Sequence, residues 1–346
     1  MAQPLRFGVV HDLRSPPGSE VSLPEMYAQA LDQLEMADEL GFELAWFTEH
    51  HFLDDGHLPN FVPVAGAVAA RTSRMRISTD ILLAPFVHPI RLAEDLAVLD
   101  NISGGRIELG IGMGYAAHEF RGFGIPQSRR VSLTEELVQI LQLAWQGEPF
   151  SFEGKRWRLD DLLVTPAPVQ PGGPPLWIAG MSRNAAVRAA RFDTHLLPQG
   201  APDIVLEPWR DELRATGRDP DDYRVGIIRS VFVTDDREGA WQQIRAAERY
   251  RAGVYARLFD ETPDEFTAFD PSKGAIPQGW IVGDEDHCTA ELIAFINQYG
   301  VTDVCTWGGP PGLAPSIMND SLECLARHVI PRVRASIEDG ADGGVG

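Results

Sequence analysis

The chain alternates short apolar runs rich in β-forming residues with longer segments of helical periodicity. LRFGVV (5–10), PLWIAG (175–180) and VTDVCTW (301–307) are three of the short runs. Between the first two strands, apolar residues recur every three or four positions, as expected for a helix: Tyr27, Leu31, Leu34 and Ala37. Such alternation is typical of βα units with parallel strands, and eight of them predict a closed (β/α)8 TIM barrel. We therefore expect one barrel domain over residues 1–346.

Two stretches interrupt this alternation and are expected to be insertions in the barrel. Residues 147–173 end in a connector rich in proline and glycine, and they predict a short β-excursion. Residues 254–280 contain many turn-forming residues and few apolar pairs. Long irregular segments of this kind often form loops over active sites, so we expect a mobile loop there.

Charge and composition exclude several classes of protein. The chain has 30 Lys and Arg against 50 Asp and Glu, a formal net charge of −20, which disfavours nucleic acid and anionic membrane surfaces as partners. No run of 18 apolar residues predicts a membrane span, and the N-terminus does not resemble a signal peptide. Three cysteines without close spacing predict no disulfide framework. A cytoplasmic protein is expected.

The segment LAWFTEHHF (44–52) places Glu49, His50 and His51 at the end of a predicted strand. In a TIM barrel the carboxyl ends of the strands carry the chemistry, so these side chains are candidates for catalysis. A metal site and a purely structural imidazole are the alternatives. Because consecutive strand residues point to opposite sides, His50 and His51 are not expected to share one site. We expect no metal.

Glycines follow the fourth predicted strand in LGIGMGYAAHEF (109–120). Gly112, Gly114 and Ala117 have the G-x-G-x-x-A spacing of a dinucleotide-binding turn. The acidic residue that this fingerprint requires about 20 positions later would fall inside a helix, which weakens that interpretation. Glycines at a strand end also let a flat ligand approach the backbone closely.

The fifth predicted strand leads into AGMSRNAAVRAA (179–190), where a helix starts near Ser182. Backbone N–H groups at a helix start, together with a serine hydroxyl, suit a phosphate group. An ordinary serine N-cap explains the same residues equally well.

Several motifs, in order and spacing, resemble the bacterial luciferase-like flavin monooxygenases. The resemblance extends over about residues 5–335 and rests on WFTEHHF, HPIRLAEDLAVLDNISGGR, ELGIGMGYAAHEFRGFG, PPLWIAGMS and VGDEDHCTAELIAFINQYGVTDV. It implies a TIM barrel that binds reduced FMN and uses O2 to oxygenate a small organic substrate through a flavin hydroperoxide.

The resemblance also implies roles for particular residues. By motif position His50 corresponds to a catalytic acid/base, and Glu49 is expected to orient it. The peptide bond between Asp80 and Ile81 matches a place where the family often has a cis bond under the flavin ring. The remaining cofactor-binding candidates follow the fourth and fifth strands: Gly112, Met113, Gly114, Gly180, Met181 and Ser182.

One position departs from the family pattern. Met113 stands where luciferase has an arginine, so Arg183 or Arg229 is expected to supply the cation for the flavin phosphate. This departure also argues against luminescence. On the substrate side we expect His11, Asp12, Tyr115 and Arg229.

The resemblance implies partners as well. A separate NAD(P)H-dependent flavin reductase is expected to supply reduced flavin, and a homodimer is expected through the helices after the second and third strands. A deazaflavin-dependent oxidoreductase of the same fold and a non-catalytic flavin-binding barrel are the alternatives. Because deazaflavin members often have an apolar residue at the second histidine, His51 favours FMN. The organic substrate is not identified by the sequence.

Overall fold

The computed structural model describes residues 3–200, 202–259, 276, 277 and 279–342. By internal contacts the chain divides into two compact units, and each is described by itself. Unit 1 comprises Trp46–Leu53 and Leu58–Tyr223, together with Met1. Unit 2 comprises Ala2–Ala45, Asp54–His57 and Arg224–Gly346. The strand β2 (Leu44–Phe47) begins in unit 2 and ends in unit 1.

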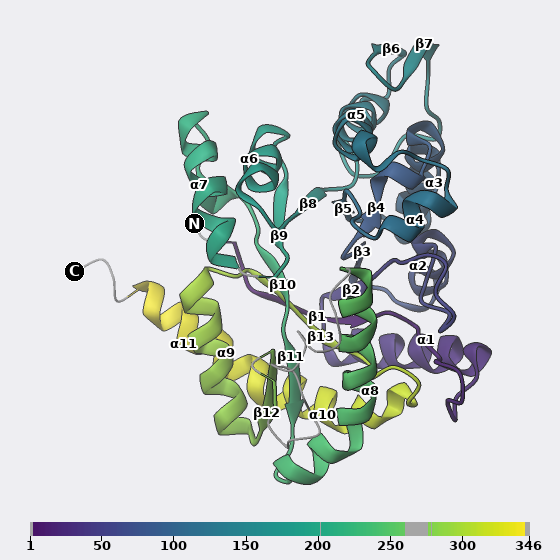
Figure 1. The fold of residues 1–346 in the computed structure, drawn as a ribbon. Coiled ribbons are helices and arrows are strands. Elements are labelled where there is room, and N and C mark those ends of the chain that lie inside the picture. Colours follow the sequence, from purple (N-terminus) through teal and green to yellow (C-terminus); the bar gives the residue numbers. More distant parts are fainter. Residues whose placement is uncertain (1–2, 201, 260–275, 278, 343–346) are drawn as a thin grey trace. The chain divides into compact units, whose positions relative to one another are not determined.

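Unit 1 is built on a parallel sheet with the strand order β4-β5-β8-β9 (Figure 1). The strands of unit 1 as a whole are β3 (Arg76–Thr79), β4 (Leu82–Leu83), β5 (Leu109–Gly112), β6 (Phe150–Glu153), β7 (Arg158–Leu162), β8 (Leu176–Gly180) and β9 (His195–Pro198). Its α-helices are α2 (Phe61–Arg71), α3 (Pro89–Ser103), α4 (Ala117–Gly122), α5 (Arg130–Ala144), α6 (Arg183–Arg191) and α7 (Leu206–Ala215). Short 3-10 turns are η1 (Ala84–Phe86), η2 (Gln127–Arg129), η3 (Pro202–Ile204) and η4 (Pro220–Asp222).

The helices of unit 1 bury the apolar faces that the sequence predicts. Leu92, Leu96 and Leu99 of α3 are all buried, and the alanines of α6 form a small buried face that lets α6 pack closely on β8. Gly104 and Gly105, which follow α3, have positive φ angles and make a sharp turn.

The predicted excursion at 147–173 contains an antiparallel hairpin of β6 and β7. Glu136 of α5 anchors its turn. The carboxylate of this buried residue accepts backbone N–H bonds from Lys155, Arg156 and Trp157 at 2.8–3.2 Å. Three N–H donors converging on one carboxylate fix the hairpin to the helix.

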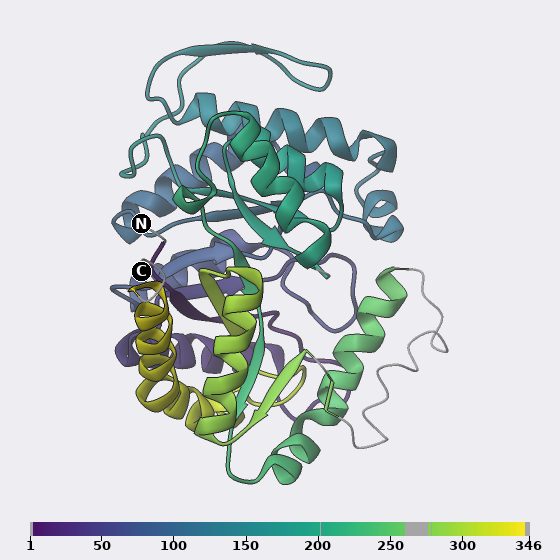
Figure 2. The same cartoon turned by 90° about the vertical axis from the view of Figure 1, so that its left-hand side faces the viewer.

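Unit 2 pairs β1 (Arg6–His11) and β10 (Gly226–Ile228) with the two edges of β13 (Asp303–Trp307), all parallel. A second parallel pair joins β11 (Ser230–Val233) to β12 (Trp280–Gly283). The helices of unit 2 are α1 (Leu23–Leu40), α8 (Arg237–Leu258), α9 (Glu285–Tyr299), α10 (Asn319–Cys324) and α11 (Ile330–Asp342). Two further turns are η7 (Pro315–Met318) and the π-helical η8 (Leu325–Val329). Figure 2 shows α9 and α11 side by side.

The expected loop at 254–280 is only partly described. Residues 254–258 continue α8, whereas 260–275 and 278 lie outside the described residues. Trp280, the last residue of the expected loop, instead begins β12, a strand that was not predicted. No helix in the described part of the chain is long and apolar enough to cross a membrane.

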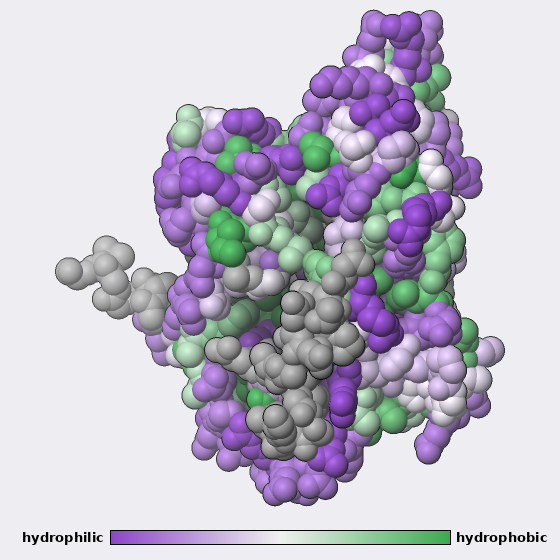
Figure 3. Space-filling model, viewed as in Figure 1, coloured by the Kyte–Doolittle hydropathy of each residue, from purple (hydrophilic) through white to green (hydrophobic). Residues whose placement is uncertain are grey.

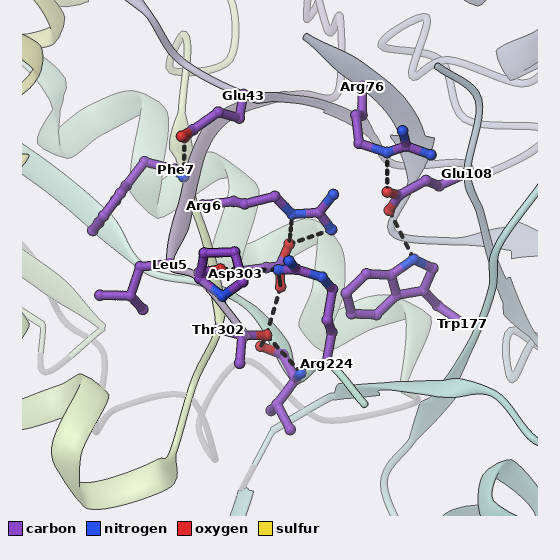
Figure 4. Close-up of polar contacts among 12 residues, drawn as sticks. Leu5, Arg6, Phe7, Glu43, Arg76, Glu108, Trp177, Arg224, Thr302 and Asp303 are labelled. Atoms are coloured by element: carbon purple, nitrogen blue, oxygen red, sulfur yellow. Dashed lines mark hydrogen bonds and ion pairs between the residues drawn. The ribbon is translucent and has the colours of Figure 1, made fainter. Parts of the chain in front are cut away.

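A buried carboxylate ties together the amino ends of strands in unit 2 (Figure 4). Asp303, at the start of β13, is fully buried and accepts from the Nε atom of Arg6 at 2.5 Å and from Nη1 of Arg224 at 3.1 Å. The hydroxyl of Thr302 also donates to it at 2.6 Å. These bonds hold the amino ends of β1 and β13 in register.

Unit 1 has its own buried carboxylate of this kind (Figure 4). Glu108, which precedes β5, pairs with Arg76 at the start of β3 and accepts from the indole N–H of Trp177 at 2.9 Å. In a barrel fold, residues at the amino ends of the strands serve stability and those at the carboxyl ends serve chemistry. The carboxyl ends of the strands are therefore the expected place of a functional site.

Candidate functional site

His50 lies just beyond the carboxyl end of β2 and is 6% exposed. Its Nδ1 atom is 2.9 Å from Oε1 of Glu119, a fully buried residue of α4. The backbone N–H of His51 donates to the same oxygen at 2.9 Å. A carboxylate that accepts from Nδ1–H fixes the ring orientation and leaves Nε2 as the atom able to accept a proton.

Tyr115 lies on the other side of the His50 ring. Its hydroxyl oxygen is 3.4 Å from Nε2 of His50, and the two rings meet edge to face with centroids 5.8 Å apart. The Nε2 atom of Gln127 donates to the Tyr115 carbonyl at 2.9 Å, and Arg130 donates to the carbonyl of Gly114 at 3.3 Å. The Glu119 carboxylate, the His50 imidazole and the Tyr115 phenol thus form a series of neighbouring polar groups, and backbone hydrogen bonds fix the segment that carries Tyr115.

Glu49, the expected partner of His50, is instead close to His51. Its Oε1 atom is 3.2 Å from Nε2 of His51 and accepts from the backbone N–H of Leu83 at 3.1 Å. The His51 ring packs edge-on against Phe86 and Phe123. Glu49 and His51 line a cavity of about 390 Å³, together with Pro59, Asn60, Val62, Leu82, Phe86, Val87, His88, Arg91, Leu92, Asp95 and Phe123.

Glu119 is not among the site residues predicted from the sequence. The residue lies inside the quoted segment LGIGMGYAAHEF, in the first turn of the helix that follows β5. The sequence offers one indication of its role, because Glu119 is an acidic residue that follows a strand at the same end of the fold as His50. The separation of 69 positions between Glu119 and His50 does not by itself indicate that they are in contact.

Asp80 follows β3, and the peptide bond between Asp80 and Ile81 is cis, as the resemblance predicts. The side chain is 7% exposed, and its Oδ1 atom accepts from the amide of Gln199 at 2.6 Å. Burial raises the pKa of Asp80 to about 7, and the hydrogen bond from Gln199 opposes this shift in part. Asp80 is therefore a carboxyl group that changes charge near neutral pH.

Gly112, at the end of β5, packs against the side chain of Ile81. A Cβ atom there would lie 1.7 Å from Cδ1 of Ile81, so a side chain could not be accommodated without moving Ile81. Gly114 has a positive φ of 68° and turns the chain toward Tyr115, with Met113 half-buried between the two glycines.

The segment from Gly180 to Ser182 joins β8 to α6. Ser182 is the N-cap of α6 and accepts from the backbone N–H of Ala185 at 3.4 Å. Met181 is 51% exposed, and the carbonyl of Gly180 accepts from the N–H of Gln199. Arg183 is exposed in the first turn of α6. The start of this helix lies at the surface, and its expected role in binding a phosphate stays a prediction.

Unit 2 contains the remaining predicted residues. Asp12 forms ion pairs, each with a distance of 3.1 Å, with Arg14 and Arg251, and all three side chains are buried. Burial lowers the pKa of His11 to about 4, although Asp12 opposes this shift. Arg229 follows β10, and its guanidinium lies 5.0 Å from the centroid of the Phe295 ring of α9. The roles expected for His11, Asp12 and Arg229 stay predictions.

Among the described residues, no group of three His, Cys, Asp or Glu side chains is arranged to hold a metal ion. In unit 1, a carboxylate, an imidazole and a phenol lie near the carboxyl ends of parallel strands, where α/β-barrel enzymes place their active sites.

The comparisons with known proteins identify the family within this class. Residues 5–303 match the luciferase-like monooxygenases, so the chain belongs to that family, whose members depend on FMN or on the deazaflavin F420. It is 30% identical to the F420-dependent glucose-6-phosphate dehydrogenase of Nakamurella multipartita, over 88% of this chain and 92% of the relative. It is 26% identical to the oxygenase component of the flavin-dependent trigonelline monooxygenase of Acinetobacter baylyi, over 91% and 92%.

A solved structure shows the fold. The monooxygenase RslO1 from Streptomyces bottropensis superposes with a TM-score of 0.85, covering 94% of this chain and 99% of that one at 24% identity. The predicted TIM-barrel fold class is thereby confirmed.

Proposed function

We propose that the protein is an FMN-dependent monooxygenase that uses O2 to oxygenate a small organic substrate. The observation that carries the proposal is the series Glu119, His50 and Tyr115, a built acid/base group at strand ends of a flavin-dependent fold. Reduced FMN would supply two electrons, so that one oxygen atom enters the substrate and the other leaves as water.

Two observations in unit 1 fit a flavin. Gly112 and Gly114 lie at the carboxyl end of β5, and Gly114 is partly exposed, which suits a flat ring near the backbone. The exposed donors at Ser182 and the start of α6 suit the flavin phosphate. Asp80, Ile81, Gly112, Met113 and Gly114 would hold the ring, and Gly180, Met181 and Ser182 the phosphate.

The protein's own contribution is proton control and exclusion of water. Nε2 of His50 would take up or deliver a proton at the reacting oxygen, and Glu119 would stabilise the protonated ring through Nδ1. Tyr115 would pass a hydrogen bond between Nε2 and the substrate. Glu119 and His50 are buried and Tyr115 is partly exposed, so the inner part of this path is shielded from competing water.

The relatives named above also support a two-component system. The relative from A. baylyi is named as an oxygenase component. An oxygenase component requires a partner that reduces the flavin. A separate NAD(P)H-dependent flavin reductase would therefore deliver reduced FMN to this protein, in the cytoplasm. Hydride transfer with F420 is the second candidate, because the relative from N. multipartita is named as F420-dependent.

A homodimer through α2 and α3 is part of the proposal. Val98 and Ile102, one turn apart on α3, are 44% and 57% exposed, and Figure 3 shows apolar residues at the surface over α2. Light scattering after gel filtration should give twice the mass of one chain, and Ile102→Glu should yield monomers. A wild-type mass of one chain would contradict the dimer.

The test of the function is oxygen uptake with reduced FMN supplied by an unrelated reductase. A panel of aldehydes, ketones, sulfones and nitrogen heterocycles would be screened for consumption beyond the uncoupled background. Parallel reactions with reduced F420 separate the two cofactors. The proposal fails if no compound raises oxygen consumption while F420 supports substrate reduction or oxidation without oxygen.

A further inference from the structure

The carboxyl group of Asp80 is held at the carboxyl ends of several strands of unit 1. Its backbone N–H donates to the carbonyl of Phe47 in β2 at 2.8 Å, and its side chain bonds to Gln199, which follows β9. Gln199 is fixed in turn, because its own N–H donates to the carbonyl of Gly180 in β8 at 2.8 Å. Asp80 thus lies where the proposed cofactor would lie.

Among the residues that the structure describes, no charged side chain stabilises an ionised Asp80. The two causes of its shifted pKa are burial and the Gln199 hydrogen bond, with no cation involved. The titratable groups on the elements packed against it are engaged elsewhere. Those pairings are Arg76 with Glu108, Glu49 with His51, His50 with Glu119, and His195 against the ring of Trp177.

The hydrogen-bond pattern fixes which oxygen carries the proton. Oδ1 accepts from the Gln199 amide, so a proton on this carboxyl group resides on Oδ2. Oδ2 has no hydrogen-bond partner among the described residues. The protonated side chain is therefore a donor that the protein itself does not use.

We propose that Asp80 binds the flavin as a carboxylic acid, donating a hydrogen bond from Oδ2 to a carbonyl oxygen or ring nitrogen of the isoalloxazine, with Gln199 as its positioning residue. This inference rests on the proposed function and adds to it a pH-dependent cofactor contact. Ionisation of Asp80 removes the donor and places a negative charge against an acceptor atom, so binding weakens as pH rises.

The first test measures the Kd of oxidised FMN by quenching of its fluorescence between pH 5.5 and 8.5. For the wild type we expect Kd to rise above pH 7, by up to roughly tenfold per pH unit. Asp80→Asn keeps a donor at every pH and should bind with little pH dependence beyond that of the FMN phosphate. Asp80→Leu should bind weakly throughout. Gln199→Leu should move the rise in Kd to higher pH, because the amide favours the ionised carboxylate.

The second test examines the protein without cofactor. The infrared carbonyl band of a protonated carboxyl group should appear in the wild type at pH 6, fade at pH 8 and be missing from Asp80→Asn. Absence of this band at pH 6 overturns the inference, as does an identical pH profile of Kd in the wild type and Asp80→Asn. An identical pH profile in these two proteins would overturn this inference alone and would not contradict the proposed function. Failure of every variant to bind FMN at any pH would overturn both.

Discussion

Oε1 of Glu119 accepts two hydrogen bonds at 2.9 Å, one from the imidazole of His50 and one from the backbone N–H of His51. The other oxygen, Oε2, is buried without a hydrogen-bond partner among the described residues. The carboxylate therefore orients two consecutive residues, and only one of them, His50, also lies against Tyr115. This relationship makes Glu119 the positioning residue of the site.

Glu119→Gln should slow turnover by about 10²-fold, because an uncharged amide no longer stabilises a protonated His50. The amide oxygen still accepts from Nδ1–H, so the ring orientation should be retained. The acidic limb of the pH–rate profile should then move to lower pH, a change that a merely structural role would not produce. Glu119→Asp should recover part of the rate. An unchanged pH profile in Glu119→Gln would contradict the assignment.

Tyr115→Phe removes the hydroxyl that lies 3.4 Å from Nε2 of His50 and keeps the edge-on ring contact. The expected loss in kcat is about threefold to tenfold, the range of one hydrogen bond. Thermal unfolding should be unchanged, because the ring still packs. A kcat equal to that of the wild type would exclude the hydroxyl from the proton path.

The sequence predicts the fold class because periodicity reports which faces are buried. Leu92, Leu96 and Leu99 recur at helical spacing, and the structure buries all three. Periodicity could not reveal β12, because a strand of four residues beside an irregular stretch is too short to show a recognisable alternation of apolar and polar residues. Nor could it divide the run MRISTDILL (75–83), in which β3 ends at Thr79 and β4 begins at Leu82.

The sequence identified His50 but not its partner. Glu49 was expected because it is adjacent, yet neighbouring residues of an extended chain point in different directions, and Glu49 pairs with His51 instead. Glu119 and Arg251 reach the candidate residues His50 and Asp12 from helices 69 and 239 positions away. Contacts of that sequence separation follow from the tertiary fold and leave no local signal.

Glu108→Gln should destabilise the protein by about 2 kcal/mol, because the partly exposed Arg76 guanidinium loses its buried counter-charge. Glu108 is 2% exposed and also accepts from Trp177. Urea denaturation would measure the change. Glu153→Gln is the matched control, since its ion pair with Arg158 is largely exposed and should contribute little. Equal effects of the two substitutions would refute a structural role for the buried pair.

His11 should make stability depend on pH in the mildly acidic range. Its pKa in the folded protein is about 4, below the ordinary value of 6.5, because burial disfavours the charged ring. Between these values the unfolded chain binds a proton that the folded protein does not, so the free energy of unfolding falls as pH decreases. From pH 7 to pH 5 the loss due to His11 should be about 2 kcal/mol.

His11→Gln should remove this part of the pH dependence, while His328→Gln, which changes an exposed ring, should retain it. Urea denaturation of the three proteins at pH 5, 6 and 7 would give the slopes. Carboxylates elsewhere in the chain contribute equally to all three, so their effect cancels in the comparison. Parallel slopes for the wild type and His11→Gln would mean that His11 carries the same charge in the folded and unfolded states.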